Sequence, residues 1–191
     1  MCGEYIRQWS TDECLARSKQ WLAAALPQGA WASHPSWLRN VVACYQERVV
    51  VLSEFSAKVQ WLLADPELDE QAQKAIKKRP DCKAWFAGFA DLLETLPMAA
   101  SFPSDRGDAD EAVRLPTQED AAEPESSFAT PAALERAARA WAEQQEIKFG
   151  HFVGPVRAVL TGTNKGPGFF DVVFLLGKEA CVRRLRKHAA E

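Results

Sequence analysis

Apolar residues recur three and four positions apart along most of the 191-residue chain. This spacing is typical of helices that bury one face. One such stretch begins near Pro35 and continues to about Ala64. Its first apolar face consists of Trp37, Leu38, Val41, Val42 and Tyr45. Because Val49–Val51 is a β-branched run, we expect the helix to break between Arg48 and Ser53.

Polar residues mark where several helices begin. Ser10 precedes Glu13 by three positions, which is the spacing of a capping box. Asp69 stands before a short basic helix, and Thr130-Pro131 combines a capping residue with a first-turn proline. The helices that these signals predict span about 10–26, 69–79 and 131–149, and apolar spacing before Pro97 predicts another over 83–96.

The last part of the chain alternates short apolar runs with glycine and proline. We expect Pro155 to begin a helical turn and Gly162 to end it in a left-handed conformation. A tight turn at 166–168 follows, then a buried helix over 169–176 that Gly177 closes, and a basic final helix. With no convincing strand and no repeat, the pattern predicts an all-α protein.

Charge is distributed unevenly around a net value of −3. Residues 147–191 contain eight Lys and Arg against three acids, so that segment carries +5. Residues 101–127 contain eight acids against two Arg, which gives −6, and residues 98–129 lack helical periodicity. The acidic stretch therefore reads as a flexible insertion. The basic end is compatible with a phosphate-binding surface or with a solvated last helix.

The sequence lacks the residue patterns of most enzyme sites. It has neither a phosphate-binding loop nor a dinucleotide glycine fingerprint. Its three histidines and five scattered cysteines have no zinc spacing, so we expect no metal site and reduced thiols in a cytoplasmic protein. No apolar run is long enough to span a membrane. We therefore expect no catalytic residues in this chain.

Four segments carry a family resemblance: Gly3–Arg7, Tyr45–Arg48, Gln71–Lys74 and Pro155–Glu179. They resemble the C-terminal anticodon-binding region of bacterial-type glutamyl-tRNA synthetases, although Cys2 replaces the family's usual Asn and Val159 its usual Ala. The resemblance implies two packed helical subdomains that form an anticodon-binding cage. The first would cover residues 1–66, and the second would cover residues 67–191 with the acidic insertion at 98–129.

The resemblance also implies where RNA would bind. Arg157 matches an arginine that faces the anticodon, and Arg48 matches the position that reads the third anticodon base. Guanidinium groups can bond base edges in a fork or stack on unpaired bases. An ion pair of Arg157 with Asp171 and a surface pair of Arg48 with Glu47 remain open alternatives.

The remaining implied contacts lie around the 166–168 turn and in the final helix. Base contacts are expected from Thr161, Gly166, Pro167 and Phe169. For Thr161 the alternative is a bond within its own helical turn, and for Phe169 it is the core. Contacts with the RNA backbone, which position RNA without reading its sequence, are expected from Lys165, Arg183, Arg184 and Lys187.

The family's catalytic motifs, of the His-Ile-Gly-His and Lys-Met-Ser-Lys-Ser types, do not occur here. The resemblance therefore assigns ATP, Mg²⁺ and glutamylation to a catalytic domain outside this chain, which should be inactive by itself. The expected partner is tRNA(Glu), with no DNA, no membrane and a monomeric state. A free-standing tRNA-binding paralogue and a helical protein-interaction adaptor remain alternatives.

Overall fold

The computed structural model of the protein describes residues 2–26, 35–97 and 130–190. By the contacts within the chain, the protein divides into two compact units, with the boundary between Ala64 and Asp65. Every regular element among the described residues is a helix, so the predicted all-α class is confirmed. The predicted acidic insertion at 98–129 lies outside the described residues.

The first unit is a small helical bundle. In it α2 packs against α4 and α5. The buried amide of Gln46, at the end of α4, donates from Nε2 to the carbonyls of Ile6 and Trp9, both at 2.8 Å. These bonds fix the junction of α1 and α2 against α4. The helices are α1 (Cys2–Gln8), α2 (Thr11–Ala25), α4 (Pro35–Gln46), α5 (Glu54–Lys58) and α6 (Gln60–Leu63).

The break predicted between Arg48 and Ser53 is confirmed, and it begins two residues earlier than predicted. Helix α4 ends at Gln46, and the next helix begins at Glu54. Between them the Tyr45 carbonyl accepts the N–H groups of Arg48 and Val49, at 2.8 and 3.0 Å. Val49 is buried while its β-branched neighbours are exposed. Apolar spacing alone would continue the helix through this segment. Instead, the segment is a turn in which Val49 is buried.

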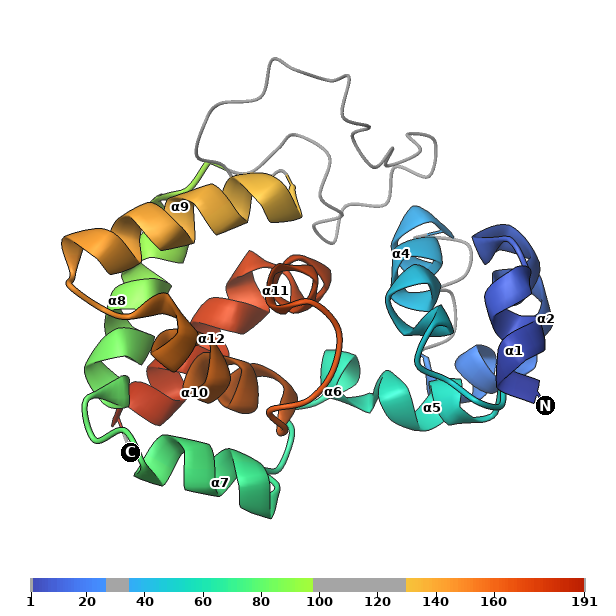
Figure 1. The fold of residues 1–191 in the computed structure, drawn as a ribbon, viewed down its shortest axis with the longest axis horizontal. Coiled ribbons are helices and arrows are strands. Elements are labelled where there is room, and N and C mark those ends of the chain that lie inside the picture. The colour runs from blue at the N-terminus through green and yellow to red at the C-terminus, as the bar shows by residue number, and fades with distance from the viewer. Residues whose placement is uncertain (1, 27–34, 98–129, 191) are drawn as a thin grey trace. The chain divides into compact units, whose positions relative to one another are not determined.

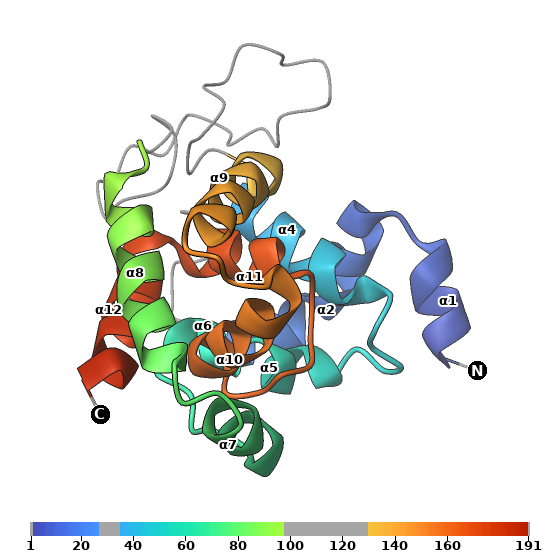
Figure 2. The same ribbon diagram turned by 60° about the vertical axis from the view of Figure 1, so that its left-hand side comes forward.

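The second unit contains the remaining six helices of the described residues. Helix α12 packs along α8, α7 packs against α10, and α11 packs against α9. Figures 1 and 2 show α10 near the middle of this unit, with α7 alongside it. The helices are α7 (Glu70–Lys77), α8 (Cys82–Thr95), α9 (Pro131–Gln144), α10 (Phe149–Thr161), α11 (Phe169–Leu176) and α12 (Lys178–Ala190).

A cluster of aromatic rings joins four helices of the second unit. Phe89 of α8 lies 5.0 Å from Phe152 of α10 and 5.9 Å from Trp141 of α9, measured between ring centroids. Phe169 of α11 lies 5.9 Å from Phe152. Edge-to-face and tilted pairs of this kind add specific attraction to the apolar area that they bury. The cluster therefore sets how α10 and α11 meet.

Two predicted helix starts and one predicted helix end are confirmed, whereas the helix predicted over 131–149 ends earlier, at Gln144. Oγ of Ser10 accepts the N–H of Glu13 at 3.2 Å, and Oγ1 of Thr130 accepts that of Ala133 at 3.1 Å. Gly162 ends α10 with a φ of 78°, in the left-handed region. Each cap satisfies a backbone group that the helix leaves unpaired.

The predicted boundary at Pro155 is wrong. Helix α10 begins at Phe149, so Gly150 lies inside its first turn and Pro155 lies in its interior. The proline ring is buried, and its nitrogen has no hydrogen to donate to the His151 carbonyl. The helix extends backward because Phe149 stacks with Phe170 and Phe152 enters the aromatic cluster. Tertiary packing thus outweighs the local proline signal.

Candidate nucleic-acid interface

Arg157 joins α10 to the turn that follows it. Its side chain is half-buried on α10, and Nη1 donates a short hydrogen bond to the Pro167 carbonyl. The bond spans ten residues of sequence and crosses the loop between α10 and α11. The guanidinium therefore holds the turn directly, and the turn and the arginine form one local structure. The expected role of Arg157 at the anticodon remains a prediction.

The turn itself exposes backbone. Gly166 has a φ of 148°, and no atom lies within 4 Å of the position that a Cβ would occupy there. Lys165 and Gly166 are exposed, whereas Pro167 is buried. A ligand can approach a glycine backbone closely, because no side chain stands in the way. These three expected site residues are contiguous in space as well as in sequence.

Thr161 closes the end of α10 on itself. Its Oγ1 lies 3.0 Å from the Arg157 carbonyl and 2.8 Å from the Thr163 carbonyl, and its hydroxyl proton can go to either. The Thr163 N–H also approaches this oxygen, at 3.4 Å. Of the two alternatives for Thr161, the structure has the bond within its own helical turn.

Phe169 takes the core alternative. Its side chain is buried, and its ring contacts Phe89, Phe152 and Phe170 at centroid distances of 5.1–6.1 Å. It therefore anchors the first turn of α11 in the aromatic cluster. Its contribution to an RNA site is to fix the end of the 166–168 turn.

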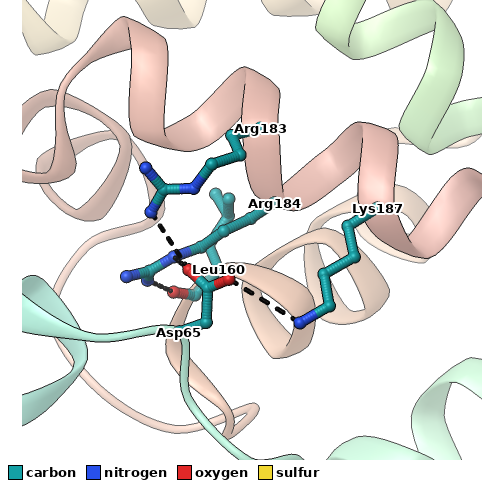
Figure 3. Close-up of polar contacts among 5 residues, drawn as sticks. All are labelled: Asp65, Leu160, Arg183, Arg184 and Lys187. Carbon is teal, nitrogen blue, oxygen red and sulfur yellow. Dashed lines mark hydrogen bonds and ion pairs between the residues drawn. The ribbon is translucent and has the colours of Figure 1, made fainter.

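The basic residues of α12 gather around one acid. Asp65 accepts from Arg183 and from Arg184, each at 3.1 Å, and Lys187 Nζ lies 3.7 Å from its other oxygen (Figure 3). Arg184 also donates to the Leu160 carbonyl at 2.5 Å. The hydrogen bond from Arg183 is the largest cause that lowers the pKa of Asp65 below its usual value, and Arg184 acts in the same direction. Asp65 is therefore held ionised among three cations.

The expectation that Arg184 contacts RNA phosphates is wrong. Its side chain is only 2% exposed, and the guanidinium joins Asp65 to the last turn of α10. Burial lowers the pKa of Arg184, and Asp65 opposes that effect. Arg183 and Lys187 are 64% and 54% exposed, so they remain accessible although both are ion-paired. The reason for the error is the 119-residue separation between Asp65 and Arg184.

Arg48 belongs to the first unit. It is exposed in the turn directly after α4, and its N–H donates to the Tyr45 carbonyl at 2.8 Å. The Tyr45 side chain is buried, and its hydroxyl accepts from Trp61 Nε1 at 2.7 Å. The backbone at Arg48 is thus tied to the core of its unit while the side chain faces solvent.

Sequence analysis missed the segment 65–69, which contacts the loop after α10. The Asp69 N–H donates to the Gly162 carbonyl at 2.8 Å, and a Cβ at Gly162 would lie 2.5 Å from the Glu67 carbonyl oxygen. The Asp69 carboxylate accepts the Ala72 N–H at 2.6 Å. That bond and one from the Thr163 hydroxyl lower the pKa of Asp69. Only the capping role of Asp69 was visible in sequence.

Two kinds of feature are absent from the described residues. In the ranges 2–26, 35–97 and 130–190, no cluster of three or more His, Cys, Asp or Glu side chains is placed to hold a metal ion. No helix in those same ranges combines the length and the apolarity needed to cross a bilayer.

Comparisons with known proteins identify the family. The family model of the anticodon binding domain matches residues 13–106 and 112–189. The glutamate–tRNA ligase of Thermus thermophilus is 32% identical over all of this chain, which covers 33% of that ligase. The ligase of a Bradyrhizobium species is 30% identical over 96% of the chain, which covers 34% of it. The chain thus spans about a third of the length of these relatives.

A solved structure has the same fold. The glutamate tRNA ligase of Elizabethkingia meningosepticum, determined in complex with its amino acid, superposes with a TM-score of 0.73 at 18% sequence identity. The match covers 99% of this chain and 31% of that one. This likeness shows the fold, and the family model, which spans both units, shows that this chain belongs to the anticodon-binding domain family.

Proposed function

We propose that this chain recognises the anticodon of tRNA(Glu) as the RNA-reading part of a glutamate–tRNA ligase. The observation that carries the proposal is the family match over both units, together with an exposed Lys165-Gly166 backbone in the second unit. Sequence-specific recognition of RNA targets unstacked bases of loops, which hydrogen-bond to protein and stack on guanidinium planes. The chemistry of glutamylation, with ATP and Mg²⁺, is assigned to a catalytic part outside this chain.

Each unit contributes a different contact in this proposal. In the second unit the turn at 165–167 meets base edges with its backbone, and Arg157 holds that turn through the Pro167 carbonyl. Arg183 and Lys187 meet phosphates from the exposed side of α12. In the first unit Arg48 reads the third anticodon base. A guanidinium presents several donors in a fixed plane, so it distinguishes base edges better than an ammonium group does.

The test measures binding of RNA stem-loops that differ only at the third anticodon base. The wild-type chain is expected to bind the loop with C at that base more tightly than the loop with G. Arg48→Gln should abolish the preference, at a cost of roughly 5- to 140-fold for the preferred loop, since a good base contact contributes about 1–3 kcal/mol. Arg48→Lys should restore the affinity only in part.

The matched control is Arg39→Gln. Arg39 is also an arginine of the first unit, on α4, but it pairs with Asp12 at 2.7 Å. The control should leave both affinity and preference unchanged. Equal binding of all stem-loops by the wild-type chain refutes the proposed function, whatever the variants do.

A further inference from the structure

Every cation of α12 has a partner within the second unit, whereas the cations at the junction of α7 and α8 form no ion pair among the described residues. Arg186 of α12 pairs with Asp91 at 2.5 Å and with Glu94 at 3.1 Å, and Lys178 donates to two backbone carbonyls. Asp65 forms ion pairs with the other three cations of that helix. The acids that compensate this helix come from α8 and from the segment before α7.

The junction of α7 and α8 is different. Residues 77–83 contain four cations and one acid, Asp81, so this corner keeps a net charge of +3. Across the described residues, none of these four cations takes part in an ion pair. Three of them are exposed and Arg79 is half-buried. We call this surface the basic corner, and its cations are Lys77, Lys78, Arg79 and Lys83.

Local helix electrostatics explain only part of the corner. Lys77 and Lys78 lie at the C-terminal end of α7, where positive charge is favourable. Lys83 lies in the first turn of α8, where the helix dipole disfavours a cation, and that turn contains no acid. Although Asp81 is the N-cap residue of the same helix, Lys83 forms no ion pair in the described parts of the chain.

Helix α7 connects the basic corner to the loop after α10. Helix α7 packs against α10. Asp69, the residue before α7, donates its N–H to the carbonyl of Gly162, the residue that ends α10. From Asp69 to Lys77 the helix rises about 12 Å. One strand of a stacked duplex advances about 3.4 Å along its axis for each phosphate, so that span corresponds to three or four nucleotides of a stacked stem. Figures 1 and 2 show α7 beside α10 in both views.

One face of α7 consists of apolar residues that are buried or half-buried. Ala72 is fully buried, and Ala75 and Ile76 are half-buried on the same side. The lysines project from the opposite, solvent-facing side, so they do not contribute to the packing of α7 on α10. Their charge is available to a partner in solution.

We propose that the basic corner binds the phosphate backbone of the same RNA whose bases meet the 165–167 turn. This inference rests on the proposed function. It places the principal phosphate contacts of the second unit on α7 and α8, where charge is uncompensated, in addition to those on α12. Contacts of this kind position RNA without reading its sequence.

The experiment uses the full chain and stem-loop RNA over a range of salt concentrations. A variant with Gln at residues 77, 78, 79 and 83 removes the corner. The control carries Gln at four cations that each have an ion pair: Arg7, Arg17, Arg39 and Arg186. Both variants change the net charge equally. Circular dichroism checks that both are folded.

The corner variant should bind all stem-loops more weakly and keep the wild-type preference at the third anticodon base. Its plot of log affinity against log salt should become shallower by about 0.7–0.9 for each phosphate that the variant does not neutralise and the wild type does. The control should keep the wild-type slope. A corner variant whose slope equals that of the control overturns the inference and leaves the proposed function standing.

Two further outcomes separate the possibilities. In the first, the corner variant loses salt-dependent RNA binding, but the wild-type chain shows no preference among the anticodon stem-loops. That result supports the phosphate surface and refutes the proposed function. A corner variant that loses binding of polyglutamate of matched charge as strongly as it loses RNA assigns the surface to acidic polypeptides and overturns the RNA proposal.

Discussion

Removing Asp65 should destabilise the second unit more than removing its buried partner, Arg184. The guanidinium of Arg184 is 2% exposed, whereas the Asp65 carboxylate is 36% exposed. Asp65→Ala leaves a cation in the interior that water cannot reach. Arg184→Met leaves a carboxylate that water can reach and that Arg183 and Lys187 still contact. The two halves of this ion pair are therefore unequal.

The expected loss of unfolding free energy for each variant follows from how far the remaining partner is buried. Breaking a fully buried pair from one side costs about 3–5 kcal/mol, and the partial exposure of Asp65 reduces this to about 2–3 kcal/mol for Asp65→Ala. Arg184→Met loses the bond to the Leu160 carbonyl, yet it removes the cost of burying a guanidinium and fills the space with an apolar chain. We expect about 0–1.5 kcal/mol for Arg184→Met. When Arg184→Met is already present, Asp65→Ala should add less than about 1 kcal/mol.

Urea denaturation followed by circular dichroism measures these differences, and hydrogen exchange of α10 and α12 amides assigns them to the second unit. The matched control is Asp91→Ala, which removes one partner of Arg186 from an exposed pair. That change should cost clearly less than Asp65→Ala, because both side chains of this pair are exposed. If Asp65→Ala costs no more than Asp91→Ala, or less than Arg184→Met, the argument from unequal burial is refuted.

Four other measurements test the structure. The stability difference between wild type and Asp65→Asn should be fully present above about pH 4, the usual pKa of Asp in an unfolded chain. It should disappear as the pH falls through the lowered pKa of Asp65 in the folded protein, and urea midpoints measured at several pH values would show this. Gly162→Ala should lower the unfolding free energy by about 1–2 kcal/mol, because the residue has a φ of 78° and a Cβ would lie 2.5 Å from the Glu67 oxygen; an unchanged urea midpoint contradicts this. Thr163→Val should accelerate amide exchange in the 163–168 loop, whereas Thr130→Val, which removes the cap of α9, should not. Cys14, Cys82 and Cys181 should resist thiol reagents in the native state, since burial raises the pKa of each thiol, and rapid native labelling of any of them shows that its surroundings open.

The elements that depend on neighbouring residues could be predicted from the sequence. A cap is a bond between a side chain and an N–H three residues later, so Ser10, Asp69 and Thr130 identify their helix starts without knowledge of the fold. Gly162 identifies a helix end for the same reason. The start of α10 could not be predicted this way, because it depends on Phe149 and Phe152 packing against rings from α9 and α11. Pro155 is a strong local signal that this packing overrides.

In the candidate site, too, only the features that depend on neighbouring residues could be predicted, and its charged residues show why. The +5 of residues 147–191 is a correct count, but counting cannot show which charges face solvent. Asp65, which is 118 residues away from Arg183 in sequence, contacts three of those cations and holds Arg184 in the core. The shorter basic run at 77–83 keeps its charge because no acid from elsewhere in the described chain reaches it. An RNA phosphate gains most from cations that give up no existing partner to bind it, since a paired cation must first release its carboxylate. The electrostatic part of RNA binding should therefore depend more on α7 and α8 than on the more basic α12.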